Sequence, residues 1–257
     1  TDIYCKKKGI SSVPSSHQFV SKTVLKAFSN KMHGTWRTNF IKLPSTKIQC
    51  GDINRINTNI HAYSNANENI LNRETESYIA TLNMTVLKIL RGTKGVDERL
   101  FDLNKLKSYF VYQILRDDSI IRSLPGCGHM TTLKMKNDFI EGEFASHPLS
   151  KDFENHALIV CIDPQQKLLG CNFVICLHKT DSTETLAIPI SPAMLLVLTN
   201  DFDHFDNQNI LRYKHLACTT LKPLEVQNIN KKIVFCGKQK GLGYIFVKNP
   251  NILKKYL

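Results

Sequence analysis

Apolar residues recur with a helical period in the first half of the chain. Residues 69–91 place their apolar side chains largely on one side of a helix, and Gly92 ends the pattern. A second pattern begins after Asp102, a good N-cap residue, and runs to about Leu124, where Pro125 stops it. A shorter helix is expected over about 20–30, capped by Ser16 or Ser21. The two long helices, joined by a polar connection, predict a helical hairpin.

The pattern changes after Pro148, where short apolar or β-branched runs alternate with turn signals. The predicted strands are Ala157–Ile162, Leu168–Leu177, Glu184–Ile190, Met194–Leu198, Lys232–Cys236 and Gly243–Lys248. Residues 33–65 are expected to be strand and loop, with Trp36–Leu43 extended. We therefore predict one α+β domain over residues 1–257, helix-rich over about 16–148 and strand-rich over about 149–257. In it, an N-terminal helical hairpin region packs with a C-terminal, mainly antiparallel β region.

The composition is that of a globular protein. Hydrophobic residues make up 42% of the 257 residues and charged residues 22%. No run approaches the length of a membrane-spanning helix, and Thr1–Lys8 lacks an apolar signal-peptide core, so we expect a cytoplasmic protein with no membrane partner. Most of the eight cysteines lie in apolar runs, which predicts reduced and largely buried thiols rather than a disulfide scaffold.

Charge is distributed unevenly along the chain. Residues 1–60 carry ten Lys/Arg and two Asp, a net +8, and residues 208–257 carry ten Lys/Arg and one Glu, a net +9. Residues 61–207 carry 14 basic and 19 acidic residues, a net −5. If the two basic ends meet, they form one positive face that attracts a polyanion such as RNA or DNA. The other interpretation is that the lysines only keep the protein soluble.

Four lysines near the C-terminus are the predicted nucleic-acid-binding residues. Lys238 and Lys240 belong to a basic hairpin turn expected between strands that end at Cys236 and start at Gly243. The set is Lys231, Lys232, Lys238 and Lys240. The segment lacks the Gly-Lys-Ser/Thr of a phosphate-binding loop.

His17, Glu74 and Arg116 are the predicted catalytic residues. Histidine moves protons near neutral pH, a carboxylate orients it, and arginine binds a phosphate through two hydrogen bonds. Gln113 lies three residues before Arg116 and so on the same helical face, while Glu76 is an alternative to Glu74. The alternative interpretation is structural, with Arg116 bound to a neighbouring aspartate.

The segment Ser16–Phe28 joins a histidine and a turn serine to a Leu25/Phe28 apolar stripe. It resembles the opening motif of an uncharacterised bacterial family, the domain-of-unknown-function family four-two-three-eight. Gln113-Ile-Leu-Arg116 is similar to that family's Gln-x-x-Arg helix signature, and Phe173–Cys176 and Ile188–Pro192 look like its paired strands. The resemblance covers most of the chain and implies a fold rather than a reaction, because the family has no agreed activity. Cys176-Leu177 stands where the family has Ser-Asp.

Two weaker patterns suggest other chemistry. Arg122 and His129 have the spacing seen in some HEPN-type ribonucleases, although Pro125 interrupts the helix between them. Cys171, Cys176 and His178 do not provide the four clustered ligands that structural zinc needs, so no metal site is predicted. The sequence does not identify a cofactor.

The leading hypothesis is a nucleic-acid-directed, nuclease-like effector. Its setting, defence against mobile elements, comes from the genomes in which such families occur. The alternative is a non-catalytic regulatory module that binds a polyanion or a protein through its basic face.

Overall fold

The computed structural model describes residues 16–18, 21–56, 58–60, 75–94, 101–116, 155–201, 216–241 and 243–257. For residues 16–18, 58–60, 115 and 116 it describes the backbone alone. Strand β1 (Ser16–Gln18) pairs with β5 (Thr58–Ile60) in antiparallel fashion. The remaining described strands form two larger sheets.

The central sheet contains five of the described strands. In spatial order they are β11 (Leu216–Thr220), β6 (Ala157–Ile162), β10 (Met194–Thr199), β9 (Glu184–Ser191) and β8 (Ile175–Lys179). All neighbours are antiparallel except β11 and β6. Every residue of β6 and β10 is buried, because both faces of this sheet are covered.

A second sheet joins the two ends of the chain. Its order is β2 (Ser29–Met32), β3 (Thr35–Leu43), β12 (Gly243–Val247) and β7 (Gly170–Cys171), and β4 (Gln49–Asp52) also pairs with β3. Ile41 of β3 lies opposite Ile245 of β12. Parts of the two basic ends therefore lie side by side, which is the condition that one positive face requires.

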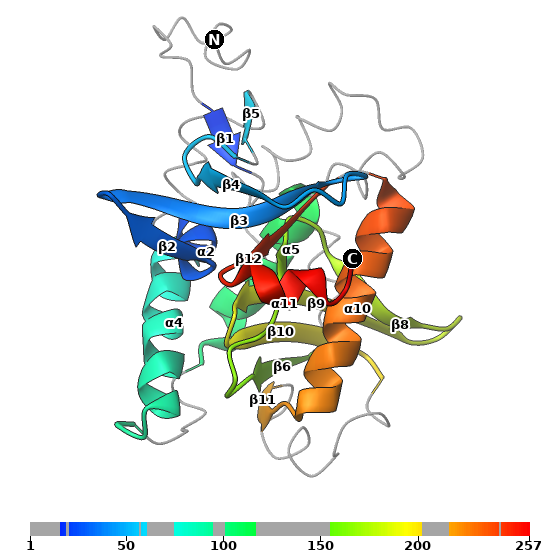
Figure 1. Ribbon diagram of the computed structural model, residues 1–257. Helices are drawn as coiled ribbons and strands as arrows, with labels where there is room; N and C mark the ends of the chain where they lie inside the picture. The colour runs from blue at the N-terminus through cyan, green and yellow to red at the C-terminus, as the bar shows by residue number, and fades with distance from the viewer. Residues whose placement is uncertain are drawn as a thin grey trace, which may run out of the picture.

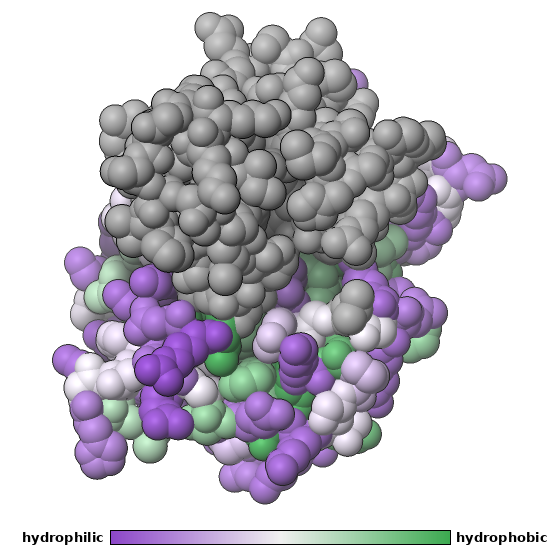
Figure 2. All heavy atoms as spheres, turned by 90° about the horizontal axis from the view of Figure 1, so that it is seen from above, coloured by the Kyte–Doolittle hydropathy of each residue, from purple (hydrophilic) through white to green (hydrophobic). Residues whose placement is uncertain are grey.

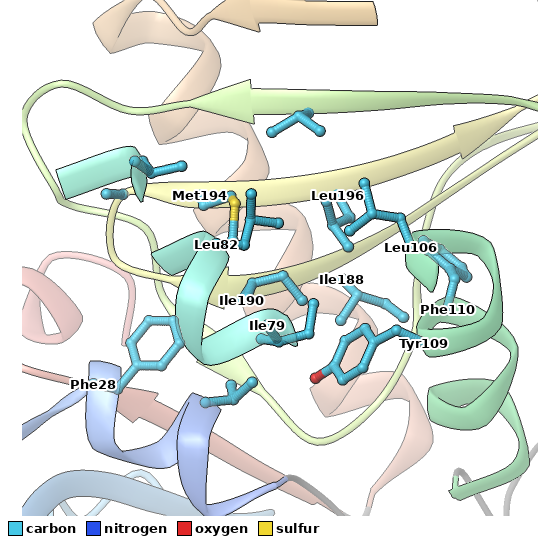
Figure 3. Packing of buried hydrophobic residues seen from close by; sticks show 14 of the residues in the cluster. Phe28, Ile79, Leu82, Leu106, Tyr109, Phe110, Ile188, Ile190, Met194 and Leu196 are labelled. Atoms are coloured by element: carbon cyan, nitrogen blue, oxygen red, sulfur yellow. The ribbon is translucent and has the colours of Figure 1, made fainter. Parts of the chain in front are cut away.

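Helices cover both sides of the β-structure, in two hydrophobic cores (Figure 1). The helices are α2 (Lys22–Ala27), α4 (Ser77–Leu90), α5 (Leu103–Arg116), α10 (Pro223–Lys240) and α11 (Pro250–Lys254). Side chains of α2, α4 and α5 pack with one face of the central sheet, where Ile79, Tyr109 and Ile188 lie close together and Phe28 lies nearer to α2 (Figure 3). Side chains of α10 and α11 pack on the other face. The chain has an α+β fold.

Three of the predicted helix ends are confirmed, but the helix expected over about 20–30 ends earlier, at Ala27, and Ser29–Met32 forms β2 instead. Ser21 caps α2 by accepting a hydrogen bond from Val24 N at 3.2 Å, and the Asp102 carboxylate accepts one from Lys105 N at 3.1 Å at the start of α5. Gly92 follows α4 with a left-handed φ of 70°. The early part of the first long helix and residues 117–124 of the second lie outside the described residues, so the helical hairpin stays a prediction.

The strand predicted over 232–236 and the hairpin turn predicted after it are wrong, whereas the strand predicted from Gly243 is present as β12. Lys232–Cys236 belongs to α10 and is not a strand, so Lys238 and Lys240 lie on a helix and not in a hairpin turn. Pro223 stands in the first turn of this helix and Gly241 ends it with a left-handed φ of 64°. The buried positions are Val226, Asn230, Ile233, Val234 and Gly237, which follow the 3.6-residue period. The short apolar run 233–236 resembles a strand, and the longer helical stripe is hard to recognise in the sequence because it includes an asparagine and a glycine.

The predicted strand 168–177 is two strands in two different sheets. β7 pairs with β12, whereas β8 pairs with β9. The chain bends between them at Asn172, whose side-chain oxygen accepts a hydrogen bond from Tyr244 N at 2.7 Å. Strands β2 and β11 and helix α11 were not predicted.

Cysteines in the described part of the chain are free thiols. Cys161 and Cys171 are buried, as expected, and burial raises the pKa of the Cys161 thiol. Cys50 is exposed, which corrects the expectation for that residue. Among the described helices, none has the length and apolar character needed to cross a membrane.

Candidate polyanion-binding groove

Helix α10 carries all four lysines that the sequence predicts to bind nucleic acid, but not on one face. Lys231 and Lys238 are exposed and seven residues apart, so they lie on the same side of the helix. Lys232 is partly buried, and its Nζ lies 5.8 Å from the ring centroid of Phe235. Lys240 points about 180° away from Lys231, with its Nζ 5.7 Å from the ring of Phe173. The predicted set therefore divides, and only Lys231 and Lys238 are fully available on the outer side.

A groove runs beside α10, α11 and the loop that follows β6. It consists of two adjoining pockets of about 350 and 290 Å³, which share Gln165, Lys167, Ile252 and Lys255 as lining residues. Figure 1 shows α11 beside α10. Residues of both helices line the second pocket. Because four lining residues are common to both pockets, the two pockets are parts of one groove.

The lining of this groove is basic. Lys167 and Lys255 line both pockets, Lys248 lines the first and Lys231 the second. Neither pocket has an aspartate or glutamate among its lining residues. The lysines are accompanied by amide side chains, namely Gln165, Gln166, Gln227, Asn249 and Asn251. Lysine ammonium groups and amide nitrogens donate hydrogen bonds, so this lining is suited to anionic oxygens.

A buried carboxylate shapes one wall of the groove. Asp163 is 1% exposed and accepts hydrogen bonds from Gln165 N at 2.9 Å and Lys167 N at 2.6 Å. These bonds hold a tight turn in which Gln166 adopts a left-handed φ of 54°. The Lys167 Nζ donates to Gln165 Oε1 at 2.7 Å, which is a neutral partner. The Asp163 carboxylate thus binds backbone amides of the turn and does not line the groove, whereas the side chains of Lys167 and Gln165 do.

Asn230 fixes this loop to α10 and to the C-terminal segment. Its side chain is fully buried, accepts a hydrogen bond from Leu169 N at 2.9 Å and donates to Lys167 O at 2.9 Å. The same amide lies 3.3 Å from the Tyr256 hydroxyl, which lines the second pocket. One side chain thus connects three parts of the groove.

The N-terminal strands support the other end. The backbone oxygen of Lys248 accepts hydrogen bonds from Asn30 Nδ2 at 3.2 Å and Asn39 Nδ2 at 3.1 Å. Asn249 then caps α11 by accepting from Asn251 N at 3.0 Å. These bonds link β2 and β3, from the +8 segment, to Lys248 in the +9 segment.

The predicted catalytic residues cannot be assembled into a site. The backbone of His17 lies in β1, opposite Asn59, and Arg116 ends α5, but neither side chain is described. Glu74, Arg122 and His129 lie outside the described residues. Gln113 is 7% exposed, with no hydrogen-bond partner for its Nε2 among the described residues, and Glu76 is also buried. Catalysis by His17, Glu74 and Arg116 therefore stays a prediction.

The Cys–His motif has other contacts. Cys171 Sγ lies 3.1 Å from Phe173 O, and Cys176 Sγ lies 3.5 Å from His178 O. His178 faces Asp201 at 3.9 Å. Within the described ranges, no group of three or more His, Cys, Asp or Glu side chains could hold a metal ion.

Three lysines of the groove were missed as site residues. Lys248 and Lys255 belong to the basic C-terminal segment, so charge counting included them without distinguishing them. Lys167 lies in the middle of the chain, where the net charge is negative, so the distribution of charge did not suggest a binding residue there. The turn signal of Asp163-Pro164 before Lys167 is the local pattern that could have drawn attention to it.

Comparison of the chain with family models, with curated proteins and with solved structures gives no match. The resemblance to the domain-of-unknown-function family stays a prediction. The function of the groove has to be inferred from its own lining.

Proposed function

We propose that this protein binds nucleic acid in the groove between α10, α11 and the loop 163–169. The observation that carries the proposal is the lining: Lys167, Lys231, Lys248 and Lys255 without an acidic side chain. Lysines that neutralise phosphates release condensed counterions, and this release drives most sequence-independent binding. The net charge of +12 adds long-range attraction.

The distribution of lysines over the two pockets favours a long polyanion over a small anion. Lys248 lines only the first pocket and Lys231 only the second, while Lys167 and Lys255 line both. A chain of phosphates can contact several of them in succession, with the amides of Gln165, Gln227 and Asn251 donating further hydrogen bonds. The walls are also held in place by Asp163 and Asn230, so little ordering is required on binding.

The experiment compares a groove variant with a charge-matched control. We would measure binding of labelled RNA and DNA by fluorescence anisotropy over a range of salt concentrations. Lys167→Ala combined with Lys255→Ala should weaken binding by roughly tenfold and flatten the log–log salt slope by about 1.4 to 1.8. The control, Lys26→Ala with Lys88→Ala, removes two exposed lysines from α2 and α4, whose side chains pack in the other core.

Equal weakening by both double variants would mean that only total charge matters, and this would contradict the proposal. The absence of binding to any RNA or DNA would favour the protein-binding module instead. Cleavage is a separate question: incubation with Mg²⁺ or Mn²⁺ shows whether the chain cuts the bound strand. His17→Ala and Arg116→Ala should then stop cleavage and leave affinity nearly unchanged if those residues are catalytic.

A further inference from the structure

Helix α10 exposes an aromatic side chain among lysines. Phe235 is 53% exposed, although phenylalanine usually lies inside a protein. Lys231 precedes it by four residues and Lys238 follows it by three, so both are its neighbours on the helix surface. The Nζ of Lys232 lies 5.8 Å from its ring centroid. Lys231, Phe235 and Lys238 fall within about 60° of one another around the helix.

This stripe is continuous with the groove, because Lys231 belongs to both. Its side chain lines the second pocket, together with Lys167 and Lys255, and it stands one turn before Phe235. A strand that leaves the groove past Lys231 therefore reaches Phe235 next and Lys238 after it. In Figure 2, the described part of the surface shown is largely hydrophilic, with smaller hydrophobic areas between.

We infer that the nucleic acid is single-stranded and that one of its bases stacks on Phe235. The inference rests on the proposed function of the groove and adds the class of nucleic acid. Aromatic side chains on a basic surface bind unpaired bases, because every base has a π-face that can stack. A duplex offers phosphates to Lys231 and Lys238, but its bases are already stacked inside it. An exposed ring between lysines is therefore useful to a single strand.

The test replaces the ring and compares single-stranded with duplex ligands. We would titrate wild type and Phe235→Ala with a labelled single-stranded oligonucleotide and with its duplex at one salt concentration. Phe235→Ala should weaken single-strand binding by about tenfold and change duplex binding less than twofold. Phe235→Trp should restore single-strand binding, because tryptophan also presents a flat ring.

Leu224→Ala is the matched control. Leu224 is 65% exposed and lies on the same side of α10, eleven residues before Phe235, so its removal also deletes exposed apolar surface but no ring. It should change neither affinity by more than twofold. The far-ultraviolet circular dichroism and thermal midpoint of each variant should match those of wild type, because both side chains are exposed.

The outcomes separate the two proposals. If Phe235→Ala leaves single-strand binding unchanged, or weakens both ligands equally, the inference is wrong while the groove can still bind phosphates. If Lys167→Ala with Lys255→Ala changes the affinity for neither ligand, the proposal that the groove binds nucleic acid is wrong. Both proposals are supported if the groove variant loses affinity for both ligands and Phe235→Ala loses affinity for the single strand alone.

Discussion

At the residue scale, one buried amide controls the shape of the candidate groove. Asn230 lies in the buried stripe of α10, at a position where an apolar side chain would be expected. A polar group at such a site costs free energy unless it is hydrogen-bonded, and Asn230 is bonded to both Lys167 O and Leu169 N. Asn230 therefore fixes the loop around Lys167 and Leu169 through hydrogen bonds, at a position where other residues of the helix contribute apolar packing.

Replacing Asn230 should therefore destabilise the protein and weaken binding together. Asn230→Ala leaves the buried N–H of Leu169 without its acceptor and the oxygen of Lys167 without its donor, at a cost of about 2–3 kcal/mol in the free energy of unfolding. Urea denaturation measures this change. Asn228→Ala, an exposed asparagine on the same helix, should cost less than about 0.5 kcal/mol. Similar unfolding curves for the two variants would show that the bonds of Asn230 contribute little.

At the element scale, α10 is held close to the β-structure by a residue without a side chain. A Cβ at Gly237 would collide with Leu43 Cδ1 and approach Phe173 Cζ to 3.0 Å. Both neighbours are buried, so neither can move freely. The glycine that weakens a helix in isolation is required here by close packing against β3.

Gly237→Ala consequently tests whether packing outweighs helix propensity. Alanine favours the helical conformation over glycine by about 1 kcal/mol. Overpacking a buried site costs about 1–3 kcal/mol, so we expect a net destabilisation of roughly 1 kcal/mol. The control is Gln239→Ala, at an exposed position two residues later, where the propensity term acts alone and should be neutral or stabilising. A higher thermal midpoint for Gly237→Ala would show that Leu43 and Phe173 adjust without cost.

The same helix shows what the sequence could and could not predict about elements. Strands such as β6 and β10 were predicted because β-branched and apolar runs of that length are bounded by turn signals. The segment 232–236 has the same local appearance, and only its connection to Val226 and Asn230 reveals the helical period. Short apolar runs do not distinguish a buried strand from part of a buried helix, whereas Pro223 and Gly241 do mark the helix ends.

At the scale of the whole molecule, the two basic ends of the chain meet in one sheet. The uneven charge suggested this meeting, and the pairing of β3 with β12 is its structural basis. The groove could not be predicted in the same way, because its walls come from segments that are far apart in the sequence, and Lys167 belongs to the acidic middle of the chain. When tertiary packing brings distant residues together in a site, their spacing in the sequence forms no recognisable motif.

Strand β12 should accordingly be indispensable for folding. It lies between β3 and β7, so its removal deletes the hydrogen bonds of both neighbours as well as core residues on both faces of the sheet. Residues 243–257 contribute Ile245, Phe246, Val247 and Leu253, each at most 1% exposed. Burial of four such side chains is worth about 6–12 kcal/mol, as much as the net stability of a typical domain, ~5–15 kcal/mol.

A chain that ends at Gly241 should therefore show no cooperative unfolding transition in circular dichroism. Adding a synthetic peptide of residues 243–257 should restore the transition, because the peptide can pair with β3 and refill both cores. A chain that lacks only Leu257, which is 38% exposed, is the control and should unfold like wild type. Cooperative unfolding of the chain that ends at Gly241, with an unchanged midpoint, would mean that the N-terminal strands and the central sheet are stable without β12. The meeting of the two basic ends would then be a consequence of the fold rather than one of its causes.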